Sequence, residues 1–329
     1  MGLHTDAELA DDVRRRLGAR HPVVVAAVAT PEGTRTAVLG AGADADVELG
    51  SVSKGLTGLL YAQALERGEV TPGTTLGTLL PLGAAPAARV SLGDLAAHRS
   101  GLPRLPAAAH PWRRTLELWR RGTNPYGESL AELVEQVRDV PLGRPRPRYS
   151  NLGFELLGHA LASAAGTTYA ALLRSRLAEP LGVEVLYAPA SPAGLLPGAV
   201  VGRSARGRAM APWTGEAIAP AGGVRTDAPG LAALLAALAS GRAPGIAALD
   251  PAWPFAWGAR IGAAWLTTQA DGRDVTWHNG GTGGFRSWLG VDRRAACGVA
   301  LVSATARSVD RAGFAMLADL LADVPPGSA

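Results

Sequence analysis

The stretch Glu48-Leu49-Gly50-Ser51-Val52-Ser53-Lys54 leads into a long apolar run. Lys54 is the only lysine among the 32 lysine and arginine residues of the chain. Residues three apart on a helix share a face, so a helix that starts here places the Lys54 amine beside the Ser51 hydroxyl. An amine can lose its proton where a guanidinium cannot, and a serine nucleophile needs such a partner. The stretch therefore predicts a serine nucleophile activated by a lysine.

A purely structural interpretation of the same residues stays open at this point. Ser51 could be the N-cap of the helix, a position that serine favours. Lys54 could be a solvent-exposed side chain in the first turn, although a cation there opposes the helix dipole. A four-residue motif with only two fixed positions, Ser51 and Lys54, is common by chance. The rest of the sequence must therefore decide between the two interpretations.

Composition narrows the class of protein. The 329 residues are 47% hydrophobic and 18% charged, which is enough to bury a sizeable core. The net charge of +4 comes from arginines scattered along the chain, so no nucleic-acid partner is expected. The single cysteine, Cys297, excludes an internal disulfide and a cysteine-rich metal site, and the six histidines form no His-x-x-x-His pair. No metal and no cofactor are therefore expected.

The first residues and the apolar runs of the chain indicate where in the cell the protein is expected. Residues 1–8 are polar and partly acidic, and they lack the basic and apolar regions of a secretory signal. No run approaches the roughly 18 apolar residues of a membrane span. We therefore expect a cytoplasmic protein without a membrane partner, whereas a chain trimmed of its signal would be secreted. The oligomeric state stays open.

Hydrophobic periodicity and turn residues predict the main elements. A capping box, Thr5-x-x-Glu8, precedes a helix that ends at Gly18. Further helices are predicted over residues 51–67, 130–137, 152–165, 169–177, 229–239 and 308–321. Strands are predicted over residues 23–29, 34–39, 261–267, 275–278, 287–291 and 298–303. Residues 324–329 are expected to fray.

The predicted strands come from both ends of the chain, with a helical block between them. This order predicts an α+β fold in which one antiparallel sheet, built from both chain ends, is flanked by the terminal helices. We expect residues 1–50 and 218–329 to form this α/β subdomain and residues 51–217 to form a mostly helical subdomain. Together they would make one catalytic unit with the active site between them.

Three segments carry the chemistry, and their order is more specific than any one of them. They are Ser51-Val52-Ser53-Lys54, Tyr149-Ser150-Asn151 and His278-Asn279-Gly280-Gly281-Thr282-Gly283-Gly284-Phe285. This order resembles the serine β-lactamase and penicillin-binding superfamily, and above all its class C β-lactamase-like branch, which includes family VIII carboxylesterases and D-aminopeptidases. Residues 95–103, 181–183 and 219–224 also look like stretches of that branch. The resemblance implies a β-lactamase/transpeptidase-like fold.

The resemblance also implies roles for the first two segments. Ser51 is expected to be the acylated nucleophile, and Lys54 to help remove its proton, directly or through Tyr149. Tyr149 is expected to shuttle a proton to and from the leaving group. Asn151 resembles the amide that orients Lys54 and the substrate carbonyl.

The third segment is expected to complete the site. The oxyanion would be held by the backbone N–H groups of Ser51 and Gly281, because fixed donors stabilise developing charge. Gly280 and the neighbouring glycines let the strand edge approach the substrate closely. His278 occupies the first position of this motif, whereas His98 and His159 are expected to be structural.

His278 is the departure that bears on the substrate. Class C β-lactamases usually carry lysine at this position, where it helps to bind the carboxylate of a β-lactam. A neutral imidazole is a weaker anion site. The sequence thus favours a serine hydrolase that works through an acyl-serine intermediate, an esterase or acyltransferase on a small ester or amide. A D-aminopeptidase or DD-peptidase-type amidase, a β-lactamase acting on a lactam, and an acylated sensor without turnover remain alternatives.

Overall fold

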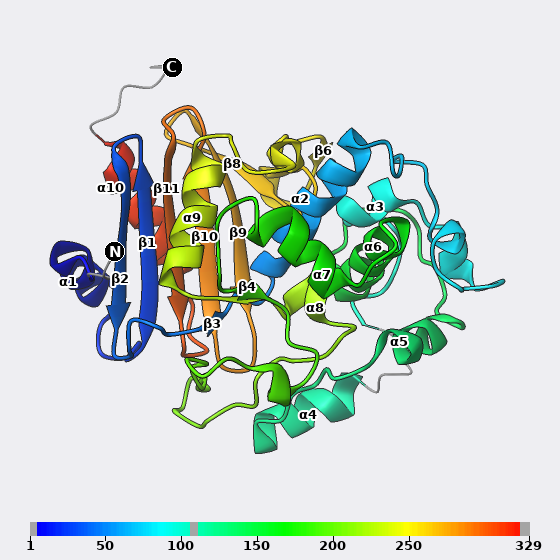
Figure 1. Ribbon diagram of the computed structural model, residues 1–329, viewed down its shortest axis with the longest axis horizontal. Coiled ribbons are helices and arrows are strands. Elements are labelled where there is room, and N and C mark those ends of the chain that lie inside the picture. The colour runs from blue at the N-terminus through cyan, green and yellow to red at the C-terminus, as the bar shows by residue number, and fades with distance from the viewer. Residues whose placement is uncertain (1–4, 106–110, 323–329) are drawn as a thin grey trace.

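The computed structural model describes residues 5–105 and 111–322, and its main feature is an eight-stranded antiparallel sheet (Figure 1). The strand order is β2-β1-β11-β10-β9-β8-β7-β6, so the two chain ends share the sheet as predicted. The bounds are β1 Val24–Thr30, β2 Gly33–Leu39, β6 Trp253–Pro254, β7 Arg260–Ile261, β8 Leu266–Ala270, β9 Arg273–Gly281, β10 Arg286–Asp292 and β11 Cys297–Ser303. The predicted α+β fold is confirmed.

Helices cover both faces of this sheet. Helix α9 (Ala228–Ala239) packs on one face, while α1 (Ala7–Leu17) and α10 (Asp310–Leu321) pack on the other. Strands β1 and β11 are therefore buried along almost their whole length, which explains their continuous runs of valine, alanine and leucine. The core consequently lies in two layers, one on each side of the sheet.

The remaining helices form a block beside the sheet (Figure 1). Helix α2 (Val52–Glu66) passes through its centre and is buried from Val52 to Ala64, so its apolar residues do not form a single stripe. It packs against α6 (Asn151–Ala164) and α8 (Ala219–Gly222). The others are α3 Leu92–Ala96, α4 Pro111–Arg121, α5 Leu130–Val137 and α7 Tyr169–Leu173. Among the described residues no single helix is long and apolar enough to cross a membrane, although the bent pair α6 and 169–178 together would be by length and composition.

Most predicted elements agree with the structure within two residues. The strand predicted over 275–278 is longer, because β9 runs on to Gly281, and three other details also differ. The N-cap of α1 is Asp6, not Thr5, because the Asp6 carboxylate accepts a hydrogen bond from the Leu9 amide. The strand predicted over 261–267 is two strands, β7 and β8, joined by a turn closed by a Gly262 N–H to Trp265 O bond. The helix predicted over 169–177 changes to one π-helical turn at Arg174–Ala178. The prediction for residues 324–329 lies outside the described residues.

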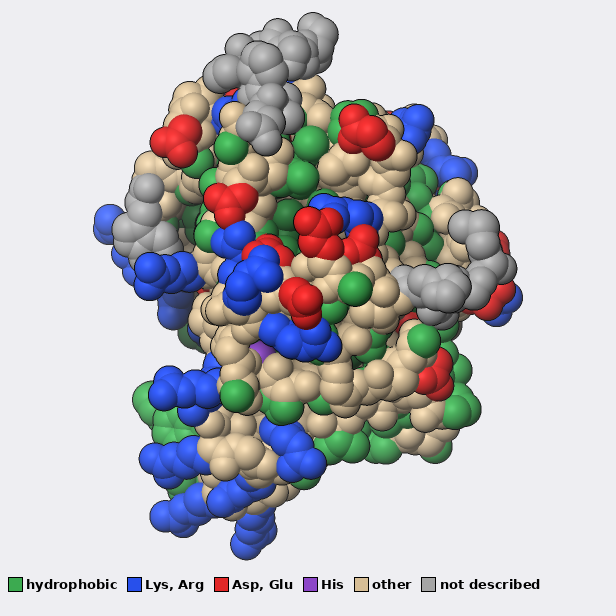
Figure 2. Space-filling model, turned by 90° about the vertical axis from the view of Figure 1, so that its left-hand side faces the viewer, with side chains coloured by type: hydrophobic (Ala, Val, Ile, Leu, Met, Phe, Trp, Pro, Cys, Tyr) green, Lys and Arg blue, Asp and Glu red, His purple; other side chains and the backbone are tan. Residues whose placement is uncertain are grey.

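Charge is unevenly distributed on the face seen in Figure 2. Arginine side chains gather at the lower end of this face, the end at which α4 lies in Figure 1. Helix α4 contributes arginines 113, 114, 120 and 121 to the chain's positive charge. On α1, arginines pair with acids three or four residues away, as in the Arg14–Asp11 pair, and on α4 Arg113 pairs with Glu117 in the same way.

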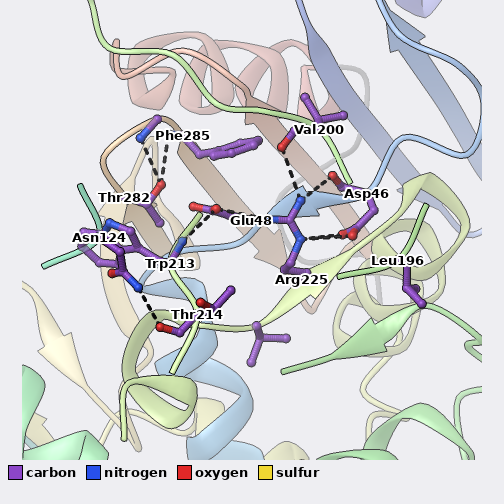
Figure 3. Close-up of polar contacts among 12 residues, drawn as sticks. Asp46, Glu48, Asn124, Leu196, Val200, Trp213, Thr214, Arg225, Thr282 and Phe285 are labelled. Carbon is purple, nitrogen blue, oxygen red and sulfur yellow. Dashed lines mark hydrogen bonds and ion pairs between the residues drawn. The ribbon is translucent and has the colours of Figure 1, made fainter. Parts of the chain in front are cut away.

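A buried charge network lies where the sheet meets the helical block (Figure 3). A second small sheet, β3 (Val47–Glu48), β5 (Arg225–Thr226) and β4 (Leu186–Tyr187), places Arg225 between Asp46 and Glu48. The Arg225 guanidinium donates to both Asp46 carboxylate oxygens, at 3.0 and 3.1 Å, and to Glu48 Oε1 at 3.1 Å. All three side chains are at most 3% exposed. Burial raises the pKa of both carboxyl groups, and the Arg225 charge opposes that rise.

Glu48 also fixes segments that border the active site. Its Oε1 accepts a hydrogen bond from the Trp213 amide at 3.1 Å, and the Thr282 hydroxyl hydrogen-bonds the same carboxylate. Thr282 Oγ1 in turn accepts hydrogen bonds from the Gly284 and Phe285 amides. The network therefore ties the strand before Ser51 to the glycine-rich turn of the third motif.

We predict that Arg225→Met destabilises the fold by about 3–5 kcal/mol, because it leaves two buried carboxyl groups without their cation. Urea unfolding at neutral pH measures the change. The control is Arg14→Met, which removes an exposed ion pair and should cost less than about 1 kcal/mol. Equal losses in the two variants would contradict the role assigned to Arg225.

Candidate active site

Ser51 lies at the N-cap position of α2, yet it does not cap the helix. Its backbone is helical (φ −66°, ψ −8°), and its side chain makes no capping hydrogen bond. Instead, the Ser51 Oγ accepts hydrogen bonds from the Tyr149 hydroxyl at 2.6 Å and from Lys54 Nζ at 3.2 Å. The interpretation of Ser51 as an ordinary N-cap is therefore wrong, and three predicted residues meet at one oxygen.

Lys54 is fully buried, which excludes the solvent-exposed alternative. Its Nζ donates hydrogen bonds to Ser51 Oγ and to the Ala221 carbonyl of α8, and it also hydrogen-bonds Tyr149. Burial lowers the pKa of Lys54 from its ordinary 10.5, while Tyr149 opposes this shift. Loss of water therefore brings the neutral amine, the form that can accept a proton, within easier reach.

The His98 ring packs against the ring of Tyr149. The two rings lie 4.7 Å apart between centroids, and His98 Nδ1 accepts a hydrogen bond from the Ser150 amide at 3.2 Å. The Ser150 hydroxyl caps α6 by accepting from the Gly153 amide. His98 has a positive φ of 54°, a rare conformation for a residue with a side chain. His98 therefore has the structural role that was expected, because it fixes the orientation of the Tyr149 ring.

Two glycines bring the third motif against the start of α2. Gly50 has φ +53°, and a Cβ atom there would lie 2.7 Å from the Gly281 nitrogen. A Cβ atom on Gly280 would lie 2.2 Å from the Leu49 carbonyl oxygen and 2.9 Å from the Ser51 nitrogen. Side chains at either position would collide with backbone. Only glycine therefore lets the end of β9, with the Gly281 N–H, lie next to the Ser51 N–H.

Asn151, the first residue of α6, is 5% exposed and contacts Tyr126. Its Nδ2 donates to the Tyr126 hydroxyl at 2.8 Å, and its Oδ1 is buried without a partner among the described residues. The hydrogen bonds of the described residues include none between Asn151 and Lys54. In this structure the amide therefore faces the site without orienting Lys54 directly.

His278 lies on β9, is 4% exposed and is neutral at pH 7. Its Nδ1 carries the proton, because it lies 2.6 Å from the Asn279 carbonyl oxygen, which can only accept. Burial, with the Lys54 charge acting in the same direction, lowers the pKa of His278 to about 4, while the hydrogen bond to the Asn279 carbonyl opposes the shift. The position that the resemblance assigns to a cation thus holds an uncharged ring.

Several contributors to the site carry no signal in the sequence. The Ala221 carbonyl and the Tyr126 hydroxyl enter through tertiary contacts alone. Glu48, three residues before Ser51, follows Asp44 and Asp46 at alternate positions, and this spacing alone does not distinguish a buried acid from an exposed one. His159, left as structural, lies on α6 with Nε2 3.1 Å from the Glu216 carbonyl oxygen. No group of three or more His, Cys, Asp or Glu side chains within residues 5–105 and 111–322 could hold a metal ion.

Comparison with known proteins assigns the family. The sequence model of the Beta-lactamase family matches residues 9–323, so the chain belongs to that family, whose members are serine hydrolases. The "D-alanyl-D-alanine-carboxypeptidase/endopeptidase AmpH" of Escherichia coli (strain K12) is 30% identical over 153 residues. That match covers 44% of this chain and 38% of AmpH, so the chain spans well under half the length of this relative.

Two solved structures share the fold. The class C β-lactamase from Rhodobacter sphaeroides has a TM-score of 0.74 at 20% identity. The superposition covers 92% of this chain and 95% of the β-lactamase chain. D-alanine carboxypeptidase AmpC from Burkholderia cenocepacia has a TM-score of 0.74 at 22% identity, with 95% and 99% of the two chains covered. At such identities the likeness concerns the fold.

We predict that Lys54→Arg lowers ester hydrolysis by about 10²- to 10⁴-fold, because a guanidinium keeps the charge but cannot accept a proton. Lys54→Met, which lacks the amine at similar length, should lose a comparable factor. Turnover of p-nitrophenyl butyrate measures the rate, and a circular-dichroism melt checks that each variant folds. Near-wild-type turnover in a folded variant would leave Lys54 without a role in proton transfer.

The lowered pKa of His278 predicts a pH-dependent contribution to stability. The unfolded chain takes up a proton near pH 6.5 and the folded chain only near pH 4, so stability is lost as the pH falls between these values. His278→Asn should remove up to about 3 kcal/mol of that loss. Urea unfolding of the wild type and the variant from pH 7 to pH 4 measures the loss of stability in each. The difference between them isolates His278, because both proteins contain all the other titrating groups. Parallel pH profiles would contradict the prediction.

Proposed function

We propose that this chain is an esterase or acyltransferase that acts on a small ester or amide through an acyl-serine intermediate. Lys54, in its deprotonated form, takes the Ser51 proton, directly or through Tyr149, as Ser51 Oγ attacks the substrate carbonyl. The Ser51 and Gly281 N–H groups hold the oxyanion that forms. When the intermediate collapses, the bond to the leaving group breaks, and the leaving group takes a proton from Tyr149. Lys54 then returns a proton to Tyr149. Water or another acceptor gives up a proton to the same pair as it attacks the acyl-serine, and Ser51 Oγ takes that proton back when its bond to the acyl group breaks.

The observation that carries the proposal is the meeting of Tyr149 and Lys54 at Ser51 Oγ. Both groups that this chemistry needs lie within hydrogen-bond distance of the nucleophile before any substrate binds. The neutral His278 supports an ester over a β-lactam, since a substrate carboxylate gains little from an uncharged imidazole.

A DD-peptidase or D-aminopeptidase-type amidase is the second candidate. The 30% identity to AmpH, whose name records D-alanyl-D-alanine carboxypeptidase and endopeptidase activity, favours it. A peptide amide and an ester pass through the same tetrahedral intermediate, so the residues around Ser51 suit both. A β-lactamase and an acylated sensor without turnover are the outcomes against which the experiment discriminates.

We predict that kcat/KM for p-nitrophenyl butyrate exceeds that for nitrocefin and for an acyl-D-alanyl-D-alanine peptide. Ser51→Ala should abolish all turnover. Ser53→Ala is the matched control, because Ser53 Oγ lies on the same helix but accepts a hydrogen bond from the Val224 amide. Peptide hydrolysis faster than ester hydrolysis would favour the second candidate. Faster nitrocefin hydrolysis would indicate a β-lactamase, and a stoichiometric burst without turnover would indicate a sensor.

A further inference from the structure

Glu155 is a buried acid that the proposed reaction does not use. It lies on α6, one turn after Asn151, and is 4% exposed. Among the described residues its carboxyl group has no hydrogen bond and no ion pair, and it lines a cavity of about 610 Å³. Burial raises the pKa of Glu155 to about 8, and the Lys54 charge opposes the rise. An ionised carboxylate without a partner is costly at such a place, so Glu155 stays protonated near neutral pH until a cation binds beside it.

The cavity borders the active site through Tyr126. The hydroxyl of Tyr126 accepts the hydrogen bond of Asn151, and its ring stands edge-on to Trp213 with 4.7 Å between centroids. Tyr126 and Trp213 both line the cavity, as do the apolar side chains of Leu118, Leu133 and Ala217. A substrate whose carbonyl reaches Ser51 could therefore place the rest of its acyl chain between aromatic walls, with Glu155 beside it.

The other charged residues of the lining do not compete for the same role. Glu128 is paired with Arg114 and accepts from Gln136. Arg104 and Arg148 are exposed, so water and salt screen their repulsion of a cation in the cavity. Glu155 is the acidic lining residue that is both buried and without a hydrogen bond or ion pair within the described part of the chain.

We propose that Glu155 and the aromatic walls of this cavity bind a primary ammonium group carried by the acyl part of the substrate. An ammonium offers three donors to the carboxylate, and aromatic faces attract a desolvated cation. The assignment rests on the proposed function, because it places an acyl chain next to Ser51. It narrows the substrate to an amino-acyl ester or amide.

Two esters of equal shape test the proposal. The p-nitrophenyl esters of 6-aminohexanoic acid and heptanoic acid differ only in an ammonium in place of a methyl group. Glu155→Gln keeps the side-chain shape and should lower kcat/KM for the amino ester by ~10- to 100-fold more than for heptanoate, as expected for a lost charge-assisted hydrogen bond. Glu135→Gln is the control, since it removes the same charge from an exposed site on α5 and should leave the ratio unchanged.

The two proposals fail in different ways. An unchanged ratio of kcat/KM between the two esters overturns the ammonium subsite. If Glu155→Gln also slows both esters, Glu155 acts on Lys54 instead. If neither ester acylates the wild type, the proposed function fails, and binding decides the subsite. Calorimetry of hexylammonium with Ser51→Ala should then give binding that weakens at least ~10-fold when Glu155→Gln is added. No binding, or equal binding, would overturn the subsite.

Discussion

The burial of the Lys54 ammonium is the constraint on which the rest of the site depends. A buried ammonium costs several kcal/mol unless hydrogen-bond acceptors surround it. The acceptors come from distant parts of the chain: the Ala221 carbonyl of α8, the Ser51 hydroxyl at the head of α2, and Tyr149 just before α6. These three elements must pack at fixed distances for the cation to be tolerated, so the same contacts that satisfy Lys54 also place its amine beside the Ser51 hydroxyl.

Loss of water sets the charge of the neighbouring groups as well. Asp46 and Glu48 are buried with Arg225 between them, and this network holds the Trp213 and Thr282 segments at the edges of the site. His278 is buried, has no acidic partner within residues 5–105 and 111–322, and stays neutral at pH 7. The site therefore has an uncharged ring on the strand side, and the carboxyl group of Glu155, which has no ion pair in the described part of the chain, lines the cavity beside Tyr126. Which charges a substrate can bring follows from this distribution.

The sequence predicted elements best where local signals agree. Residues 130–137 form α5 with the predicted bounds, because Ser129 and Glu132 complete a capping box. Ser51, Lys54 and Tyr149 were predicted to act together and lie in contact. The strand predicted over 261–267 failed because an apolar run hides a turn that only the backbone geometry reveals. The contacts that His98, Tyr126 and Ala221 make at the site could not be predicted, since each arises from the packing of segments far apart in sequence.

Identification of the acylated residue tests the central claim most directly. The protein is mixed with p-nitrophenyl butyrate, quenched in acid after milliseconds and digested, and the peptides are mapped by mass spectrometry. The account predicts a butyryl group on Ser51 that disappears in Ser51→Ala and forms far more slowly in Lys54→Met. A butyryl group on another residue, or unchanged turnover in Ser51→Ala, would contradict it.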